Sequence, residues 1–323
     1  MWKSKLKGAL AASLFIVGMT AQVAHAQSYP SKPIRIIAPA TPGSPTDILA
    51  RMLADGMGKS LKSPIIVDNK PGVEQLIGLE HVIKQSPPDG HTMVLVGLDS
   101  LALLPITRKD LRINLSEDLT VIAGMAEGKY ILAGPASAPY ATFGELVKAI
   151  KAEPGKFSYG ASAPTVRFPS LTLMHELGLR MEHVPYRGGS PYALDLASGL
   201  IQWGFLSETT AHTVKDRVRF YAISGKERSP SYPNVPTFAE LGFQRIQGPA
   251  YALALRKDTP APIKAKISEA AKAAIEAPSF KAKAMQSSFL DAQYEDEATV
   301  ARSLAARIKD YRDAATNMGI KPE

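Results

Sequence analysis

Short β-branched runs alternate with amphipathic segments along most of this 323-residue chain, and this alternation restricts the possible folds more than any other feature. In the N-terminal third, the sequence predicts strands over residues 34–38, 64–68 and 92–96. Between them it predicts helices that begin at Thr46 and span 76–84, with apolar side chains at spacings of three and four. Such strand–helix–strand units favour a parallel sheet with helices on both faces.

A second series of the same kind occupies the middle of the chain. Strands are predicted over 130–133, 157–159, 182–185, 203–206 and 220–223, and helices over 143–152, 170–179 and 192–198. Thr142 is the expected cap of the first of these helices, with Glu145 three residues on, the spacing of a capping box. Residues 160–169 are predicted to form a loop. Near the C-terminus, a strand over 251–255 precedes amphipathic helices over 262–277, 279–286 and 297–318.

Two α/β series without a flexible linker predict two lobes. We expect residues 27–126 and 248–323 in the first lobe and residues 127–247 in the second. The chain then crosses between the lobes and returns. A hinge of this kind places a ligand cleft between the lobes.

The first 26 residues are typical of an export signal rather than of a folded element. Three lysines in the first seven residues precede a short apolar core over 9–17, and residues 24–26 read Ala-His-Ala, a small-residue cleavage pattern. The apolar core is shorter than the roughly 20 residues of a membrane span. The sequence therefore predicts export to the periplasm with cleavage after Ala26, and no later run of 18 apolar residues indicates a membrane segment.

Charge and composition argue against several function classes. The chain has 38 Lys and Arg against 30 Asp and Glu, a formal charge of +8, and loss of the three N-terminal lysines leaves +5. This excess is too mild to indicate binding to nucleic acid, and no long basic run with interleaved aromatics is present. The chain has no Cys, which excludes disulfides and thiolate metal sites.

Sequence signatures of catalysis and of cofactor binding are missing. No G-x-S-x-G, H-E-x-x-H or Walker A pattern occurs, and none of the six histidines is paired at metal-ligand spacing. The sequence therefore predicts no enzyme, no cofactor and no metal site.

A series of short motifs carries a resemblance to a known family. In order, they occupy residues 29–39, 42–43, 46–47, 67–72, 88–92, 154–160, 183–188, 228–229, 233–240 and 319–322. Their order and spacing, along essentially all of the mature chain, are similar to those of the Bug family, the periplasmic receptors of tripartite tricarboxylate transporters.

The resemblance implies a two-lobed, clam-shell α/β fold, similar to type II periplasmic binding proteins, with the ligand between the lobes. It implies a monomer that captures a small, usually carboxylated solute and delivers it to membrane transporter subunits. One alternative stays open at this point, a periplasmic sensor that presents the same solute to a signalling receptor.

The loop after the first strand is equivalent to a ligand-contacting loop of the family. It leads into a helix N-terminus, where unpaired N–H groups and the helix dipole suit a carboxylate. Thr46 or Asp47 can cap this helix, and for Asp47 the capping role is favoured over ligand contact. The residues expected to form the ligand site are Thr41, Gly43, Ser44, Thr46, Asp47, Asp99, Ser100, Ser162, Thr165, Arg167, Ser207 and Thr209.

Arg167 is an unexpected residue in a loop that is small and rich in Gly and Ser in the family. Its guanidinium can form a bidentate pair with a carboxylate, or it can be a solvated loop arginine. Phe168 beside it is expected to pack beneath the loop rather than to stack on a ligand.

Three further departures bear on the ligand. Residues 74–76 and 98–100 replace Gly-bearing stretches, and residues 206–209 replace an Asp-Asn pair of many members. All three segments are expected to be loops at strand ends, where α/β folds bind ligands. Without that acidic position an amine has no counter-ion, which favours a carboxylate without an amine, aromatic or bulky acids included. Asp99 and Glu208 weaken this inference, because either could hold an amine if it points into the cleft.

The export signal leads to a direct prediction. Mass spectrometry of the protein released from the periplasm should show Gln27 at the N-terminus, because the small-residue motif ends at Ala26. A full-length chain retained in the membrane fraction would contradict it.

Overall fold

The computed structural model describes residues 29–72, 75–186, 189–320 and 322. The expected signal peptide, residues 1–26, lies outside the described residues. The chain divides into two compact units, Met1–Lys32 and Pro33–Glu323, and every strand, helix and site below belongs to the second unit. Among the described helices, none combines the length and apolar character needed to cross a bilayer.

The first lobe is built on a six-stranded sheet in the order β11-β4-β10-β3-β1-β2. Its strands are β1 (Ile34–Ala38), β2 (Ile65–Asn69), β3 (Thr92–Gly97), β4 (Leu119–Glu127), β10 (Ala250–Arg256) and β11 (Glu295–Asp296). β1 pairs in parallel with β2 and β3, as the sequence predicts. The sheet as a whole is mixed rather than parallel, because β10 returns from the second lobe and pairs antiparallel with both β3 and β4.

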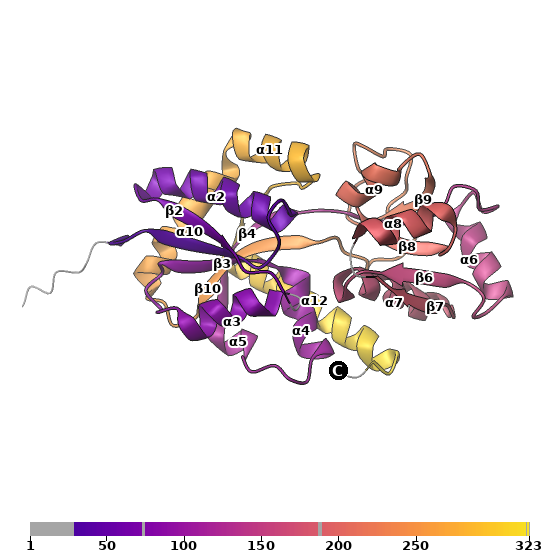
Figure 1. Ribbon diagram of the computed structural model, residues 1–323, viewed down its shortest axis with the longest axis horizontal. Helices are drawn as coiled ribbons and strands as arrows, with labels where there is room; N and C mark the ends of the chain where they lie inside the picture. The colour runs from indigo at the N-terminus through magenta and orange to yellow at the C-terminus, as the bar shows by residue number, and fades with distance from the viewer. Residues whose placement is uncertain (1–28, 73–74, 187–188, 321, 323) are drawn as a thin grey trace, which may run out of the picture. The chain divides into compact units, whose positions relative to one another are not determined.

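The second lobe is built on a five-stranded sheet in the order β7-β6-β8-β5-β9. Its strands are β5 (Tyr130–Pro135), β6 (Ser158–Ala161), β7 (Glu182–Pro185), β8 (Trp203–Ser207) and β9 (Val218–Ile223). β6 is parallel to β7 and β8, whereas β5 is antiparallel to β8 and β9. Figure 1 shows β2, β3, β4 and β10 on the left and β6 to β9 on the right.

Helices flank both sheets (Figure 1). They are α2 (Pro45–Leu61), α3 (Leu76–Gln85), α4 (Leu98–Thr107), α5 (Leu115–Asp118), α6 (Phe143–Ala152), α7 (Pro164–Leu177), α8 (Gly189–Ser198), α9 (Glu208–Val214), α10 (Ala261–Glu276), α11 (Pro278–Ser288) and α12 (Glu297–Asn317). The capping box predicted at the start of α6 is confirmed: Thr142 Oγ1 accepts from the Glu145 N–H, and the Glu145 carboxylate accepts from the Thr142 N–H.

The sequence analysis was wrong about two segments that start beside the strand ends. Residues 98–100 form the first turn of α4 and residues 208–209 the first turn of α9, whereas both were expected to be loops. α4 is apolar on nearly all sides because both lobes bury it, so it lacks the amphipathic period that would mark a helix.

The predicted loop over 160–169 is also corrected. α7 begins at Pro164, six residues before the expected start, since proline is well suited to the first position of a helix. Phe168 is 2% exposed and packs edge-on against Tyr311 of α12 with ring centroids 5.5 Å apart. The expectation that Phe168 packs is confirmed, although it does so from a helix.

Helices of the first lobe share a core with the second sheet. Ala102 and Leu103 of α4 and Tyr311 of α12 belong to the same buried cluster as Trp203 and Phe205 of β8. The second lobe is therefore held by packing as well as by the connecting chain.

The two segments that cross between the lobes touch each other through their backbones. The Gly128 N–H donates to the Pro249 carbonyl at 2.7 Å. A Cβ atom at Gly248 would collide with the Gly128 carbonyl, so only glycine allows this close approach.

This contact predicts the effect of a methyl group at the crossing. Gly248→Ala should lower the free energy of unfolding by about 1–3 kcal/mol, because the two backbones must move apart. Denaturant unfolding measures the change. Gly144→Ala is a matched control, since a Cβ there meets no atom within 4 Å and the position is helical. It should leave stability equal or slightly higher, and an equal loss in both variants would contradict the backbone-contact explanation.

Candidate functional site

A cavity of about 270 Å³ lies between the strand ends of the first lobe and the first turn of α7. Its lining residues come from three chain segments of the first lobe and one of the second: Pro39, Ala40, Pro71, Gly72, Gln75, Ser100, Leu103, Ala163, Pro164 and Thr165. The carboxyl ends of parallel strands meet at this edge, which is where open α/β sheets bind ligands.

Three helices begin at this cavity. Gln75 is the N-cap of α3, Ser100 lies in the first turn of α4, and Ala163 is the N-cap of α7. None of the three is capped by a side chain. Their positive dipole ends therefore suit an anion, while the lining residues themselves carry no charge.

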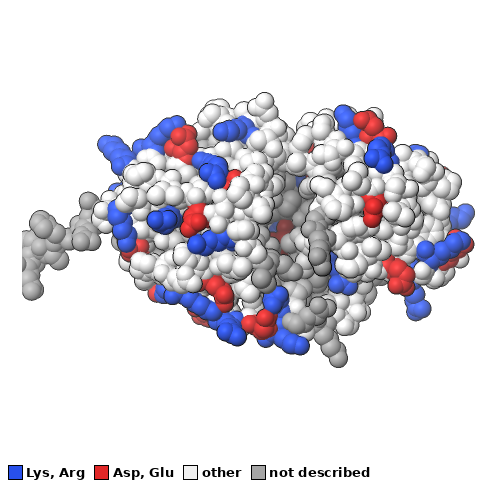
Figure 2. Space-filling view, in the orientation of Figure 1, with Lys and Arg blue, Asp and Glu red and all other residues white. Residues whose placement is uncertain are grey.

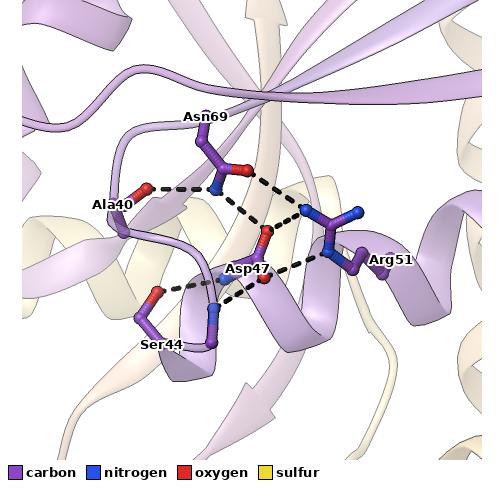
Figure 3. Close-up of polar contacts among 6 residues, drawn as sticks. Ala40, Ser44, Asp47, Arg51 and Asn69 are labelled. Carbon is purple, nitrogen blue, oxygen red and sulfur yellow. Dashed lines mark hydrogen bonds and ion pairs between the residues drawn. The ribbon is translucent and has the colours of Figure 1, made fainter.

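The loop between β1 and α2 is organised by Asp47 (Figure 3). The N-cap of α2 is Ser44, whose hydroxyl accepts from the Asp47 N–H at 3.3 Å, so the prediction that Thr46 or Asp47 caps this helix is wrong. The Asp47 carboxylate instead accepts from the Gly43 N–H at 2.9 Å and from the Asn69 amide at 2.9 Å. Arg51, one turn along, donates to both carboxylate oxygens.

These contacts hold Asp47 in its charged form. Burial opposes ionisation, but hydrogen bonds from Arg51, Gly43 and Asn69 outweigh it and lower the pKa of the carboxyl below its ordinary value. Asn69 also donates to the Ala40 carbonyl, which fixes a cavity-lining residue. Asp47 thus fixes the conformation of the loop between β1 and α2 through its bonds to Gly43 and Asn69.

The other residues expected from this loop have different surroundings. Thr41 and Gly43 are exposed at the tip of the loop, and Thr46 is buried in the first turn of α2. The cavity is lined here by Pro39 and Ala40 rather than by these three residues.

Asp99 is buried next to the cavity-lining Ser100 and is paired within the protein. Its Oδ1 accepts from Arg307 at 2.6 Å and from the Tyr311 hydroxyl at 2.6 Å. Both side chains of the ion pair are only 3–4% exposed. Burial and the Asp99 charge raise the pKa of Tyr130, whose hydroxyl bonds to the cavity-lining Thr165.

Arg167 lies on α7 and does not line the cavity. Its Nε is buried without an acceptor, and so is Nε2 of His183 on β7. Burial and the nearby Arg167 charge lower the pKa of His183. The guanidinium is therefore beside a neutral imidazole, on the side of α7 that covers β7.

The remaining expected site residues are used by the fold or lie at its edge. Ser207 caps α9 by accepting from the Thr210 N–H, and Thr209 donates to the Ser288 carbonyl of the first lobe at 3.1 Å. Glu208 is buried and accepts from Ser229, and burial raises the pKa of its carboxyl. Ser162 is partly buried in the bend between β6 and α7.

Sequence reasoning missed part of the cavity wall. Gln75 was noted only as a replacement of glycine, and Leu103 lies on a helix that was not expected. The signal that could have marked Gln75 is that it stands in a stretch where glycine was expected. The structure gives Gln75 a backbone φ of +81°, in the left-handed region that favours glycine. Arg307 and Tyr311 were also missed, since they reach Asp99 across more than 200 residues of chain. Glu74, Arg187 and Gly188, which belong to the family motifs or their replacements, lie outside the described residues.

No group of three or more metal-binding side chains comes together within the described ranges. On the face that Figure 2 shows, Lys and Arg side chains lie among Asp and Glu side chains over both lobes.

The fold and the site together define a solute-binding protein of the periplasmic type. Among solved structures, one described as a periplasmic transporter is 29% identical, with a TM-score of 0.77 over 91% of this chain and 99% of that chain. A Rhodopseudomonas palustris protein solved with adipate superposes with a TM-score of 0.78 over 91% of this chain and all of that one, at 22% identity. MatC from the same organism, solved with bound malate, gives 0.72 over 88% and 99%, at 23% identity.

Sequence comparison identifies the family. Residues 49–318 match the family described as the tripartite tricarboxylate transporter family receptor. A Cupriavidus necator protein, the UPF0065 protein in the gbd 5′ region, is 32% identical over 85% of both chains. BugT of Bordetella pertussis is 29% identical over 75% of this chain and 76% of that one. The chain belongs to this family of periplasmic solute receptors, which confirms the predicted resemblance and the prediction that it is not an enzyme.

The Asp47 contacts predict a pH-dependent contribution to stability. Asp47→Asn should lower the free energy of unfolding by about 1–2 kcal/mol at pH 7, since bonds to a charged group are lost. The folded-state pKa is lowered, so the contribution exists above the ordinary value of 3.8 and disappears as the pH falls through the folded value. The difference from the wild type should therefore shrink below about pH 3.8.

Asp55→Asn on the same helix is the matched control, and denaturant unfolding of both variants at pH 7 and below about pH 3.8 measures the changes. Asp55 also pairs with a base four residues on, Lys59, but both side chains are more than 70% exposed. The Asp55→Asn substitution should therefore change the free energy of unfolding by less than about 0.5 kcal/mol. Equal effects of the two substitutions would refute the role assigned to Asp47.

Proposed function

We propose that this receptor captures a small organic acid without an amine and delivers it to a tripartite tricarboxylate-type transporter. The observation that carries the proposal is the convergence of three helix starts without side-chain caps on one cavity. Backbone N–H groups and helix dipoles at such a point bind carboxylates without a charged side chain.

The acids near the cleft support a ligand without an amine. Asp99 is neutralised by Arg307, and Glu208 is buried against Ser229, so neither is available as a counter-ion. Asp47 is held by Arg51. An ammonium group entering the cavity would meet no carboxylate among its lining residues and would lose hydration without compensation.

The size of the cavity favours a short acid over a bulky or aromatic one. At about 270 Å³ it is slightly smaller than most ligand pockets, which run from about 300 to 1,000 Å³. Adipate and malate, with which two structural relatives were solved, are acids of this size class.

We also propose export, cleavage after Ala26 and closure of two lobes around the ligand. The first lobe would comprise residues 27–126 and 248–323 and the second residues 127–247. The division of the strands between two sheets supports these boundaries. Closure would exclude water and strengthen every hydrogen bond to the carboxylate.

The residues proposed to contact the ligand are divided by whether they line the cavity in this structure. Ser100 and Thr165 are on the cavity wall in this structure. Thr41, Gly43, Ser44, Ser162 and Arg167 are proposed to contact the ligand when the lobes close. Of the other expected residues, Thr46 is buried and Asp47, Asp99, Ser207 and Thr209 are bonded within the protein, so we propose that these five support the site from outside it. For Arg167 the support is its buried Nε without an acceptor.

A thermal-shift screen of the mature protein tests the proposed function. The panel contains aliphatic and aromatic mono-, di- and tricarboxylates together with aspartate and glutamate. A short dicarboxylate at 100 times its dissociation constant should stabilise the folded state by about 2.7 kcal/mol. If aspartate or glutamate stabilised the protein most, the claim that the ligand lacks an amine would be refuted. If no acid stabilised it, the whole proposal would be refuted. Loss of uptake of the best acid in a deletion strain would separate a transport receptor from a sensor.

A further inference from the structure

Gln75 and Ser100 meet at the cavity from two different helices. Gln75 Nε2 donates to Ser100 Oγ at 2.9 Å, and Gln75 Oε1 accepts from the Gly97 N–H at 3.1 Å. Both side chains line the cavity. We infer that Gln75 Nε2 and Ser100 Oγ form a two-donor clamp for one carboxylate of the ligand, an inference that rests on the proposed function.

The hydrogen-bond pattern fixes the orientation of the Gln75 amide. A backbone N–H can only donate, so the Gln75 atom next to Gly97 must be the oxygen. The NH2 group therefore faces Ser100, and Ser100 Oγ accepts one of its two hydrogens. The second amide hydrogen and the Ser100 hydroxyl hydrogen are used by no bond among the described residues. The pair thus offers two donors, and Ser100 Oγ also keeps one lone pair.

Two adjacent donors match the two oxygens of a carboxylate. A carboxylate accepts at both oxygens, so it can satisfy Gln75 and Ser100 together. A primary amide brings one carbonyl oxygen and no charge, so its hydrogen bonds to the pair are weaker, and an ammonium group presents donors only. Ser100 lies in the first turn of α4, so the helix dipole also favours the negative charge.

The backbone at Gln75 indicates that its side chain is needed. Its φ of +81° is in the left-handed region, where glycine fits without strain and other residues are disfavoured. The two side-chain bonds to Gly97 and Ser100 hold the residue there. A Cβ at Gly97 would lie 3.1 Å from Gln75 Nε2, so glycine at 97 leaves room for the amide.

The clamp assigns a ligand class more narrowly than the proposed function does. At least one end of the ligand must be a free carboxylate that enters end-on between α3 and α4. Esters and amides of the same acid should bind more weakly, since neither brings the negative charge that strengthens both hydrogen bonds.

Gln75→Glu tests the clamp because it keeps the shape and replaces the amide donor with a carboxylate. Isothermal titration with adipate and malate, and with adipamide as the uncharged analogue, should show that the wild type binds the acids at least about tenfold more tightly than adipamide. Gln75→Glu should weaken the acids by about 10- to 100-fold. Gln85→Glu is the matched control, since Gln85 is exposed at the other end of α3. It should bind within about threefold of the wild type.

Gln75→Gly tests whether a loss of affinity comes from misfolding, because glycine adopts the left-handed backbone at this position without strain. Its melting temperature should stay close to that of the wild type, while affinity for the acids falls at least tenfold. Acid binding within threefold of the wild type in both Gln75 variants would overturn the clamp and leave the proposed function standing. A wild type that binds none of the acids would overturn both.

Discussion

The buried ion pair between Asp99 and Arg307 links the parts of the molecule that the site depends on. Arg307 donates to Asp99 at 2.6 Å and also to the carbonyl of Gly248, which belongs to the segment that crosses between the lobes. Tyr311 donates to the same carboxylate oxygen. Removing two charges from water is costly, and good geometry with additional hydrogen bonds is what offsets that cost. The pair ties α4, whose first turn faces the cavity, to α12, which packs against α7 on the other wall.

Three acids in the described part of the site region, Asp47, Asp99 and Glu208, are each bonded to other groups of the protein. Asp47 is bonded to Arg51 and Asn69, Asp99 to Arg307, and Glu208 to Ser229. The cavity wall is left with neutral side chains and the starts of three helices. Such a wall stabilises a negative charge through oriented dipoles, which need no reorganisation when the ligand enters.

Most strands were predictable, and the exceptions have physical causes. Strands with β-branched residues next to turn residues, such as β1 and β7, were recognised at their observed positions. β4 was missed entirely, and α4 was taken for a loop because burial on all sides removes its period. The predicted start of α7 was six residues too late, because the prolines in this segment are typical of loops. In the structure, Pro164 occupies the first helical position, and the packing of Phe168 stabilises the helix.

The sequence alone determined the features that depend on near neighbours: the alternation of strands and helices, the capping box of α6, the family motifs and the lack of Cys. The sequence alone located the site less well. Of the twelve residues expected to contact the ligand, only Ser100 and Thr165 line the cavity. Tertiary structure decided the rest, because the partner of Asp99 lies 208 residues away and that of Gln75 lies 25 away. Contacts at such separations leave no periodic or local signal in a single chain, since they exist only when the elements pack.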